Sequence, residues 1–212
     1  MDACCDTKAE ELNTLRDKHR KVLILVLAIN AVLFIVEAIA GFLAHSTALL
    51  ADSLDMFGDS LVYGFTLYVL WRSAESKAIA AMLKGAIMAV FGFGVLIEAV
   101  YKMLAGVVPA AETMGIIGLL VLLGNGLCFL LLFQHRSDDL NMRSTWLCSR
   151  NDIIANAGVL LAAGGVAYFN SLWPDVVVGL VIAVLFLRTA FDVLRESIRA
   201  YRNVRENAHF AH

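Results

Sequence analysis

Long runs of apolar residues dominate this sequence and limit what it can fold into. Apolar residues make up 60% of the 212 residues and charged residues only 17%. The mean hydropathy is +0.75, which is well above that of a water-soluble domain. Several runs exceed the roughly 20 residues that a helix needs to cross the hydrocarbon core of a bilayer. We therefore expect an all-α membrane protein whose helices span the bilayer.

Six of these runs have spanning length, and they predict one membrane domain flanked by two short tails. The expected helices cover residues 21–44, 48–71, 78–104, 113–134, 143–169 and 174–200. Residues 1–20 are polar and lack the apolar core of a removable signal peptide, so we interpret them as a tail. Residues 201–212 form a second tail. The prediction is a domain of six transmembrane helices at residues 21–200.

The distribution of Lys and Arg predicts the orientation of these helices. Six crossings place both termini on one side of the membrane. Of the 17 basic residues, only Lys102 lies on the side of the links AHST, AGVVPAAET and FNSLWPD. Because basic loops stay inside, we expect both termini in the cytoplasm. The net charge of −2, without a basic stripe carrying interleaved aromatic residues, predicts no nucleic-acid partner.

Three carboxylates lie inside the second apolar run, where charge is costly. Asp52, Asp55 and Asp59 fall within the segment LLADSLDMFGDSLVYG. A charge near the bilayer centre costs about 2.5–3.5 kcal/mol even on a lenient insertion scale. Successive helical residues turn by about 100°, so Asp55 and Asp59 lie on one face, about one turn apart. Protonation, water or a bound cation must offset these charges.

The fifth apolar run repeats this spacing with Cys148 and Asp152, in the segment TWLCSRNDIIANAG. At about 1.5 Å per residue, Asp59 and Asp152 each lie about 15 Å from the start of their helices, which enter from opposite sides. Both therefore lie near mid-membrane. Asp55, Asp59, Cys148 and Asp152 supply the oxygen and sulfur ligands that zinc and its borderline-soft neighbours accept. These four residues are the predicted metal site.

The two motifs resemble those of the cation diffusion facilitator family. Residues 48–59, ALLADSLDMFGD, are similar to the family pattern A-L-x-A-D-[ASG]-x-[HD]-x-x-x-D. Residues 142–152, MRSTWLCSRND, are similar to a fifth helix that begins with M-R-S and carries H-x-x-x-D. The resemblance covers about residues 20–200, and residues on other helices support it: Asn30, Glu37, Gly41, Glu98, Asn125, Pro174 and Asp175.

The resemblance implies a dimeric exporter that exchanges divalent metal for protons by alternating access. We expect zinc as the substrate, with cadmium and cobalt as further possibilities, no cofactor, no enzymatic activity, and a bacterial plasma membrane as the location. Two features depart from the family pattern. Relatives usually carry His at the position of Cys148, and most carry a cytoplasmic domain after the sixth helix, which we expect to be absent here.

A second class of function stays open. The four ligands could belong to a membrane metal sensor that does not transport, or to a membrane-embedded metalloenzyme. An enzyme would need an open coordination position, a general base and room for a substrate. No such base stands beside the four ligands in the sequence. Binding requires deprotonated ligands, so metal and protons exclude each other, which favours exchange transport.

Other polar residues have subsidiary interpretations. Asp52 is a further ligand, a proton group or part of an entry path, and Glu37 and Glu98 are possible proton relays. Asn151 and Asn156 are expected to bond across helices. All four cysteines are expected to be thiols, with Cys128 a core residue. Possible accessory metal sites comprise His45 in a short link, His135, Asp138 and Asp139 in a basic loop, and Cys4 and Cys5 in the tail.

Overall fold

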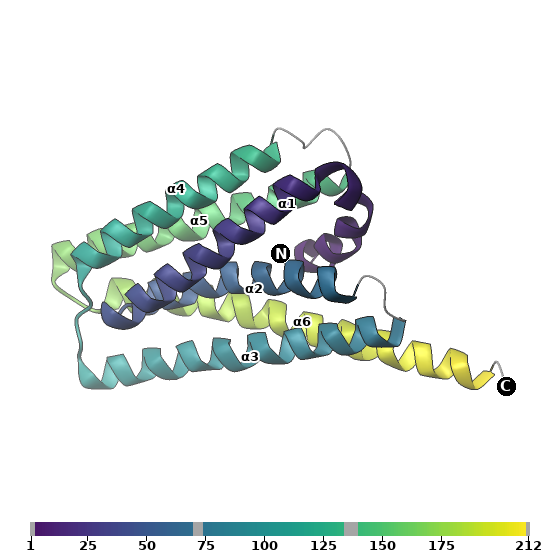
Figure 1. Cartoon of the computed structure of the whole chain (residues 1–212). Coiled ribbons are helices and arrows are strands. Elements are labelled where there is room, and N and C mark those ends of the chain that lie inside the picture. Colours follow the sequence, from purple (N-terminus) through teal and green to yellow (C-terminus); the bar gives the residue numbers. More distant parts are fainter. Residues whose placement is uncertain (1–2, 70–73, 134–139, 211–212) are drawn as a thin grey trace.

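The computed structural model describes residues 3–69, 74–133 and 140–210, which form six helices (Figure 1). The helices are α1 (Ala3–Leu43), α2 (Thr47–Val69), α3 (Ala74–Ala105), α4 (Ala111–Phe133), α5 (Leu140–Phe169) and α6 (Trp173–Phe210). Within these ranges the chain has no strand. The prediction of an all-α fold is therefore confirmed.

The helices cover the six predicted runs, but two of them are longer than predicted. α1 begins at Ala3 rather than near residue 21, and α6 continues to Phe210 rather than ending near residue 200. Both added segments lack Gly and Pro, and residues 3–20 are rich in Ala, Glu, Lys and Arg, which favour helix. Polarity predicted where the apolar part of each helix stops, and it did not predict the end of the helix itself.

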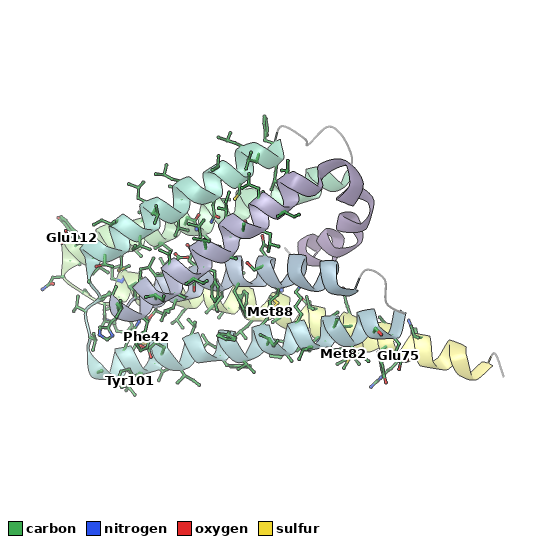
Figure 2. The ribbon with its side chains drawn as sticks, viewed as in Figure 1. Phe42, Glu75, Met82, Met88, Tyr101 and Glu112 are labelled. Carbon is green, nitrogen blue, oxygen red and sulfur yellow. The ribbon has the colours of Figure 1, made fainter. Side chains whose placement is uncertain are left out.

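Three short connections meet at one end of the bundle, which we call the short-loop end: residues 44–46, 106–110 and 170–172. Each begins with or contains a residue of positive φ, namely His45 at 53°, Gly106 at 66° and Asn170 at 46°. Left-handed residues of this kind end helices. Figure 2 shows Phe42, Tyr101 and Glu112 at the short-loop end, and Glu75 at the opposite end of α3.

α2 occupies the centre of the arrangement. It packs against α1 on one side and against α3 and α6 on the other, and it also contacts α5. α3 pairs with α6, and α4 pairs with α5. The approach of α6 to α2 is very close, because a Cβ at Gly179 would lie 2.7 Å from the carbonyl carbon of Thr47. Only glycine allows the two backbones this contact.

Polarity is inverted relative to a water-soluble protein. Large apolar side chains are exposed, among them Leu104 (84%), Leu161 (77%) and Ile97 (70%). Side chains of Glu37, Asp52, Lys102, Asn125, Asn156 and Asp175 are buried instead. An apolar outer surface over a polar interior suits a lipid surround.

Five stretches of the described residues are long and apolar enough to cross a membrane: Ile24–Leu43, Ala78–Ala105, Ala111–Phe133, Asp152–Phe169 and Trp173–Val204. The chain is therefore a multi-pass membrane protein. α2 is not among the five, because its side chains are described only from Thr47 to Leu61, which is shorter than a spanning stretch. The sixth crossing, and the side on which the termini lie, remain predictions.

Candidate metal site and its surroundings

A chain of side-chain hydrogen bonds joins three helices inside the bundle. Nδ2 of Asn125 on α4 donates to Oδ1 of Asn156 on α5, at 2.8 Å. Nδ2 of Asn156 donates in turn to Oδ2 of Asp52 on α2, at 2.6 Å. All three side chains are buried, with 1–2% of their surface exposed. The prediction that Asn156 bonds across helices is confirmed, and side-chain data for Asn151 lie outside the described residues.

The bond between Asn156 and Asp52 fixes the register of α5 against α2. At about 1.5 Å per residue, Asp55 and Asp59 lie about 4.5 and 10.5 Å further from the short-loop end than Asp52 does. Asp152, four residues before Asn156, lies about 6 Å further from that end. The carboxylate of α5 therefore has a depth between those of the two carboxylates of α2.

The orientation of these residues agrees with their depth. Residues seven apart in a helix differ by about 20° in direction, so Asp59 lies on the face of α2 that carries Asp52. Residues four apart differ by about 40°, so Asp152 shares the face of α5 that carries Asn156. All three site carboxylates, Asp55, Asp59 and Asp152, are half-buried.

α4 borders the same region through Cys128. Asp152 on α5 and Asp59 on α2 are near enough to this thiol for their charges to act on it. Nδ2 of Asn30 on α1 lies 4.0 Å from the Cys128 sulfur. The thiol is free and buried and packs with Val26 and Leu132. The prediction of a core thiol is confirmed, and its position beside the site carboxylates is a new finding.

The fourth predicted ligand has no described side chain. Cys148 stands one turn further from the short-loop end than Asp152 on helix α5, and its side chain lies outside the described residues. Among the side chains that are described, no three from His, Cys, Asp and Glu are grouped as metal ligands would be. The structure thus aligns the depths of Asp55, Asp59 and Asp152 without drawing them into a closed coordination shell.

The subsidiary residues have separate outcomes. His45 is exposed in the turn after α1, as a helix-capping residue. Glu98 is partly exposed and faces Lys102. His135, Asp138 and Asp139 lie outside the described residues, as do the side chains of Cys4 and Cys5.

Glu37 is an exception to the rule that buried polar atoms have partners. Its side chain is fully buried on α1, and among the described residues neither carboxyl oxygen has a hydrogen-bond donor. The carboxyl group of Asp52 adjoins it. Two ionised carboxylates only accept hydrogen bonds, so the contact between them cannot be a bond unless one carries a proton. An uncompensated buried charge costs several kcal/mol, which makes this pair unusual.

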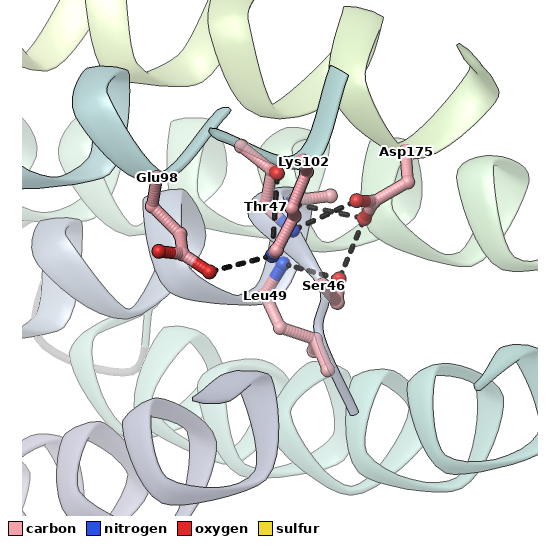
Figure 3. Close-up of polar contacts among 7 residues, drawn as sticks. Ser46, Thr47, Leu49, Glu98, Lys102 and Asp175 are labelled. Atoms are coloured by element: carbon pink, nitrogen blue, oxygen red, sulfur yellow. Dashed lines mark hydrogen bonds and ion pairs between the residues drawn. The ribbon is translucent and has the colours of Figure 1, made fainter. Parts of the chain in front are cut away.

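A second polar cluster, which sequence reasoning missed, lies at the short-loop end (Figure 3). The carboxylate of Asp175 on α6 accepts hydrogen bonds from Oγ of Ser46 at 2.6 Å, from the Thr47 amide at 2.8 Å and from the Ala48 amide at 3.0 Å. Asp175 thereby caps the start of α2 from another helix. Nζ of Lys102, buried on α3, lies 3.4 Å from Oγ1 of Thr47 and 3.8 Å from Glu98. We call these six residues the short-loop clasp.

The sequence pointed to two residues of the clasp but not to their contacts. Lys102 stands out as the single basic residue near the three short links, and Asp175 belongs to a Pro-Asp pair at the start of α6. Neither residue reveals its partner, because the helix starts that meet are 128 residues apart in the chain.

Ionisable side chains buried among membrane-spanning helices are rare, and in multi-pass membrane proteins they typically mark an ion or substrate site. The chain belongs to the cation efflux family. The sequence profile of the cation efflux transmembrane domain matches residues 23–200. This family is one of transporters rather than enzymes, and the resemblance drawn from the two motifs is confirmed.

Named relatives give the same assignment. The chain is 28% identical over 195 residues to the cadmium, cobalt and zinc/H(+)-K(+) antiporter of Bacillus subtilis, covering 85% of this chain and 62% of that protein. It is 27% identical over 197 residues to the zinc transporter ZitB of Yersinia pestis, covering 86% and 62%. It is 23% identical over 192 residues to the metal cation efflux system protein CzcD of Cupriavidus metallidurans, covering 85% and 61%. The chain thus spans about three fifths of the length of these relatives.

Proposed function

We propose that this protein exports divalent transition-metal ions across a bacterial plasma membrane in exchange for protons. Zinc is the proposed main substrate, with cadmium and cobalt as further ones, as the names of relatives suggest. Residues 21–200 form the proposed transport domain, with α2 as its sixth crossing and both tails in the cytoplasm. The protein acts as a homodimer in this proposal, as the family resemblance implies.

The observation that carries the proposal is the register of α2 against α5. It is set by the bond from Asn156 to Asp52, and it puts Asp152 at a depth between Asp55 and Asp59. Cys148 is one turn further along α5, level with Asp59 to within about 2 Å by helical rise. Asp55, Asp59, Cys148 and Asp152 are therefore the proposed ligands. The bound ion draws them together into the four-coordinate shell that zinc favours.

Exchange follows from the chemistry of these ligands. Three carboxylates and a thiol bind metal only when they are deprotonated, so a proton and a metal ion compete for each of them. With the site open to the cytoplasm, metal binds and protons leave. With the site open to the opposite side, protons displace the metal. Alternating access to a site inside the bilayer thus couples metal export to proton entry.

The test uses the purified protein in proteoliposomes, with a zinc-sensitive dye inside and an imposed pH gradient. Asp59→Asn and Asp152→Asn each remove one ligand charge and should abolish zinc flux while the protein still inserts. Asp192→Asn on α6, whose partner Arg195 lies 3.9 Å away and is largely exposed, is the matched control and should transport normally.

Binding measured by calorimetry in the same preparations separates the alternatives. A metal sensor or metalloenzyme would bind zinc without moving it across the bilayer. Flux at the wild-type rate in either ligand variant would show that the site is elsewhere.

A further inference from the structure

Glu37 and Asp52 form a buried carboxyl pair that the proposed metal site does not use. They lie on neighbouring helices, α1 and α2, with 0% and 1% of their surface exposed. Neither oxygen of Glu37 has a donor among the described residues, although the carboxyl group of Asp52 is within hydrogen-bonding reach. A hydrogen atom on one of the two groups would turn this contact into a bond.

The hydrogen bonds of the neighbouring amides determine whether Oδ2 of Asp52 acts as a hydrogen-bond donor or as an acceptor. Asn125 donates to Asn156, so the oxygen of Asn156 is used and its NH₂ group points to Asp52. Oδ2 of Asp52 is thereby held as an acceptor, which suits an ionised carboxylate. The hydrogen atom is then carried by Glu37, whose hydroxyl can donate to Asp52, or by Oδ1 of Asp52, which can donate to Glu37. In either case one proton gives the pair a hydrogen bond.

We propose that Glu37 and Asp52 bind a single proton between them, at a site separate from the metal ligands, and that metal binding at Asp55 expels it. The first half of this proposal concerns the protein alone. The second half rests on the proposed function of Asp55 as a ligand.

The charges around the pair explain why a proton is needed. The charged groups that act on Glu37 are Asp52 and Asp55, both of them acidic and both on α2. α4 contributes no base: Glu112 is exposed at its first turn, and the thiol of Cys128 lies beside Asn30, about two turns along α1 from Glu37.

The two remaining helices that pack on α1 also present acidic groups. On α5 this group is Asp152, one turn beyond Asn156, and on α6 it is Asp175, which is already bonded to the start of α2. α3, which packs on α2, carries the buried Lys84 and Lys102, and neither is among the groups whose charge acts on Glu37 or Asp52. A proton supplies the pair with a positive charge.

The position of the pair links the proton to the metal. Asp55 is one turn from Asp52 on α2, and its charge already acts on Glu37. A divalent cation held by Asp55 replaces that negative charge with a net positive one and repels the shared proton. Coupling of this kind is reciprocal, so protonation of the pair also weakens metal binding.

Infrared difference spectroscopy tests the proton directly on the full-length protein in lipid vesicles. The expected result is the carbonyl band of a protonated carboxylic acid at neutral pH, which disappears when zinc is added. Glu37→Gln should lack this band. The variant should still fold, because the amide of Gln can donate to Asp52 in place of the hydroxyl. Absence of the band from the wild-type protein would overturn the proposal even if every variant failed to fold.

Proton release on zinc binding, measured with an indicator in weakly buffered solution, tests the coupling. Glu37→Gln should release about one proton fewer per chain than wild type. Glu37→Asp, which restores a carboxylic acid, should recover most of that difference. Asp192→Asn is the control, since Asp192 faces the exposed Arg195 on α6, and it should release as many protons as wild type.

The two failures are distinguishable. If zinc does not bind wild type at all, the proposed function fails while the infrared band still reports on the carboxyl pair. If zinc binds and Glu37→Gln releases as many protons as wild type, the linkage proposed for the pair is wrong.

Discussion

Replacing Asp175 with Ala should destabilise the protein by about 3 kcal/mol, because one carboxylate satisfies three donors at the start of α2. Losing an N-cap costs about 1 kcal/mol, and each further donor left buried costs at least about 1 kcal/mol. Asp175→Asn should cost less, about 1–2 kcal/mol. Its oxygen can replace Oδ1, which accepts from Ser46 and Ala48, while its NH₂ group would face the Thr47 amide.

Reversible unfolding in mixed micelles of mild detergent and dodecyl sulfate measures the loss of stability in the two Asp175 variants. A loss of 3 kcal/mol is a change of about 150-fold in the unfolding constant, from 1.4 kcal/mol per factor of ten. Asp192→Ala is the matched control on the same helix, and it should cost at most about 0.5 kcal/mol because its ion pair is exposed. Equal losses for Asp175→Ala and Asp192→Ala would refute the reasoning, as would a larger loss for Asn than for Ala at position 175.

Two further predictions concern packing and metal choice. Gly179→Ala should cost about 1–3 kcal/mol in the same assay, since its Cβ would lie 2.7 Å from the backbone of Thr47, whereas Gly94→Ala meets no atom within 4 Å and should be neutral. Cys148→His should keep zinc transport with less relative preference for cadmium, Cys148→Ala should bind zinc weakly, and Cys148→Asp should shift toward harder ions. Competition between metals in flux assays measures this, and unchanged selectivity in all three variants would show that Cys148 faces away from the ion.

The length of the apolar runs predicted much of this fold, because the bilayer imposes a length on each helix. The starts and ends at the short loops agree with the predicted runs to within a few residues, for example Thr47 against 48 and Trp173 against 174. The apolar runs end at those points, so the change in polarity and the helix boundary coincide. At the other ends, α1 and α6 continue into polar sequence, where nothing in the hydropathy marks the helix boundary.

For the candidate site, the sequence predicted which residues share a helix face but not how the two helices align. Spacing alone put Asp55 with Asp59 on one face and gave Cys148 and Asp152 the same separation. The register between the two helices was not predictable, because it depends on the contact of Asn156 with Asp52, which are 104 residues apart. The partners of Asp175 were not predictable for the same reason, because they lie far from it in the chain. The role of Glu37 was open for another reason. The sequence does not show whether a carboxylate in an apolar run has a hydrogen-bond donor in the folded protein.

The three aspartates of α2 are consistent with its central position in the bundle. Hydropathy estimates the cost of facing lipid, and it applies to side chains that do so. From Thr47 to Leu61, every described side chain of α2 is buried or half-buried, whereas α3, α4 and α6 expose a large apolar residue on nearly every turn. α2 is shielded by α1, α3, α5 and α6, so Asp52 meets an amide and a carboxyl group rather than hydrocarbon. α5, which carries the other two proposed ligands, exposes Ile154 and Leu161 and is among the five apolar stretches, so shielding along the whole described length distinguishes α2 from α5.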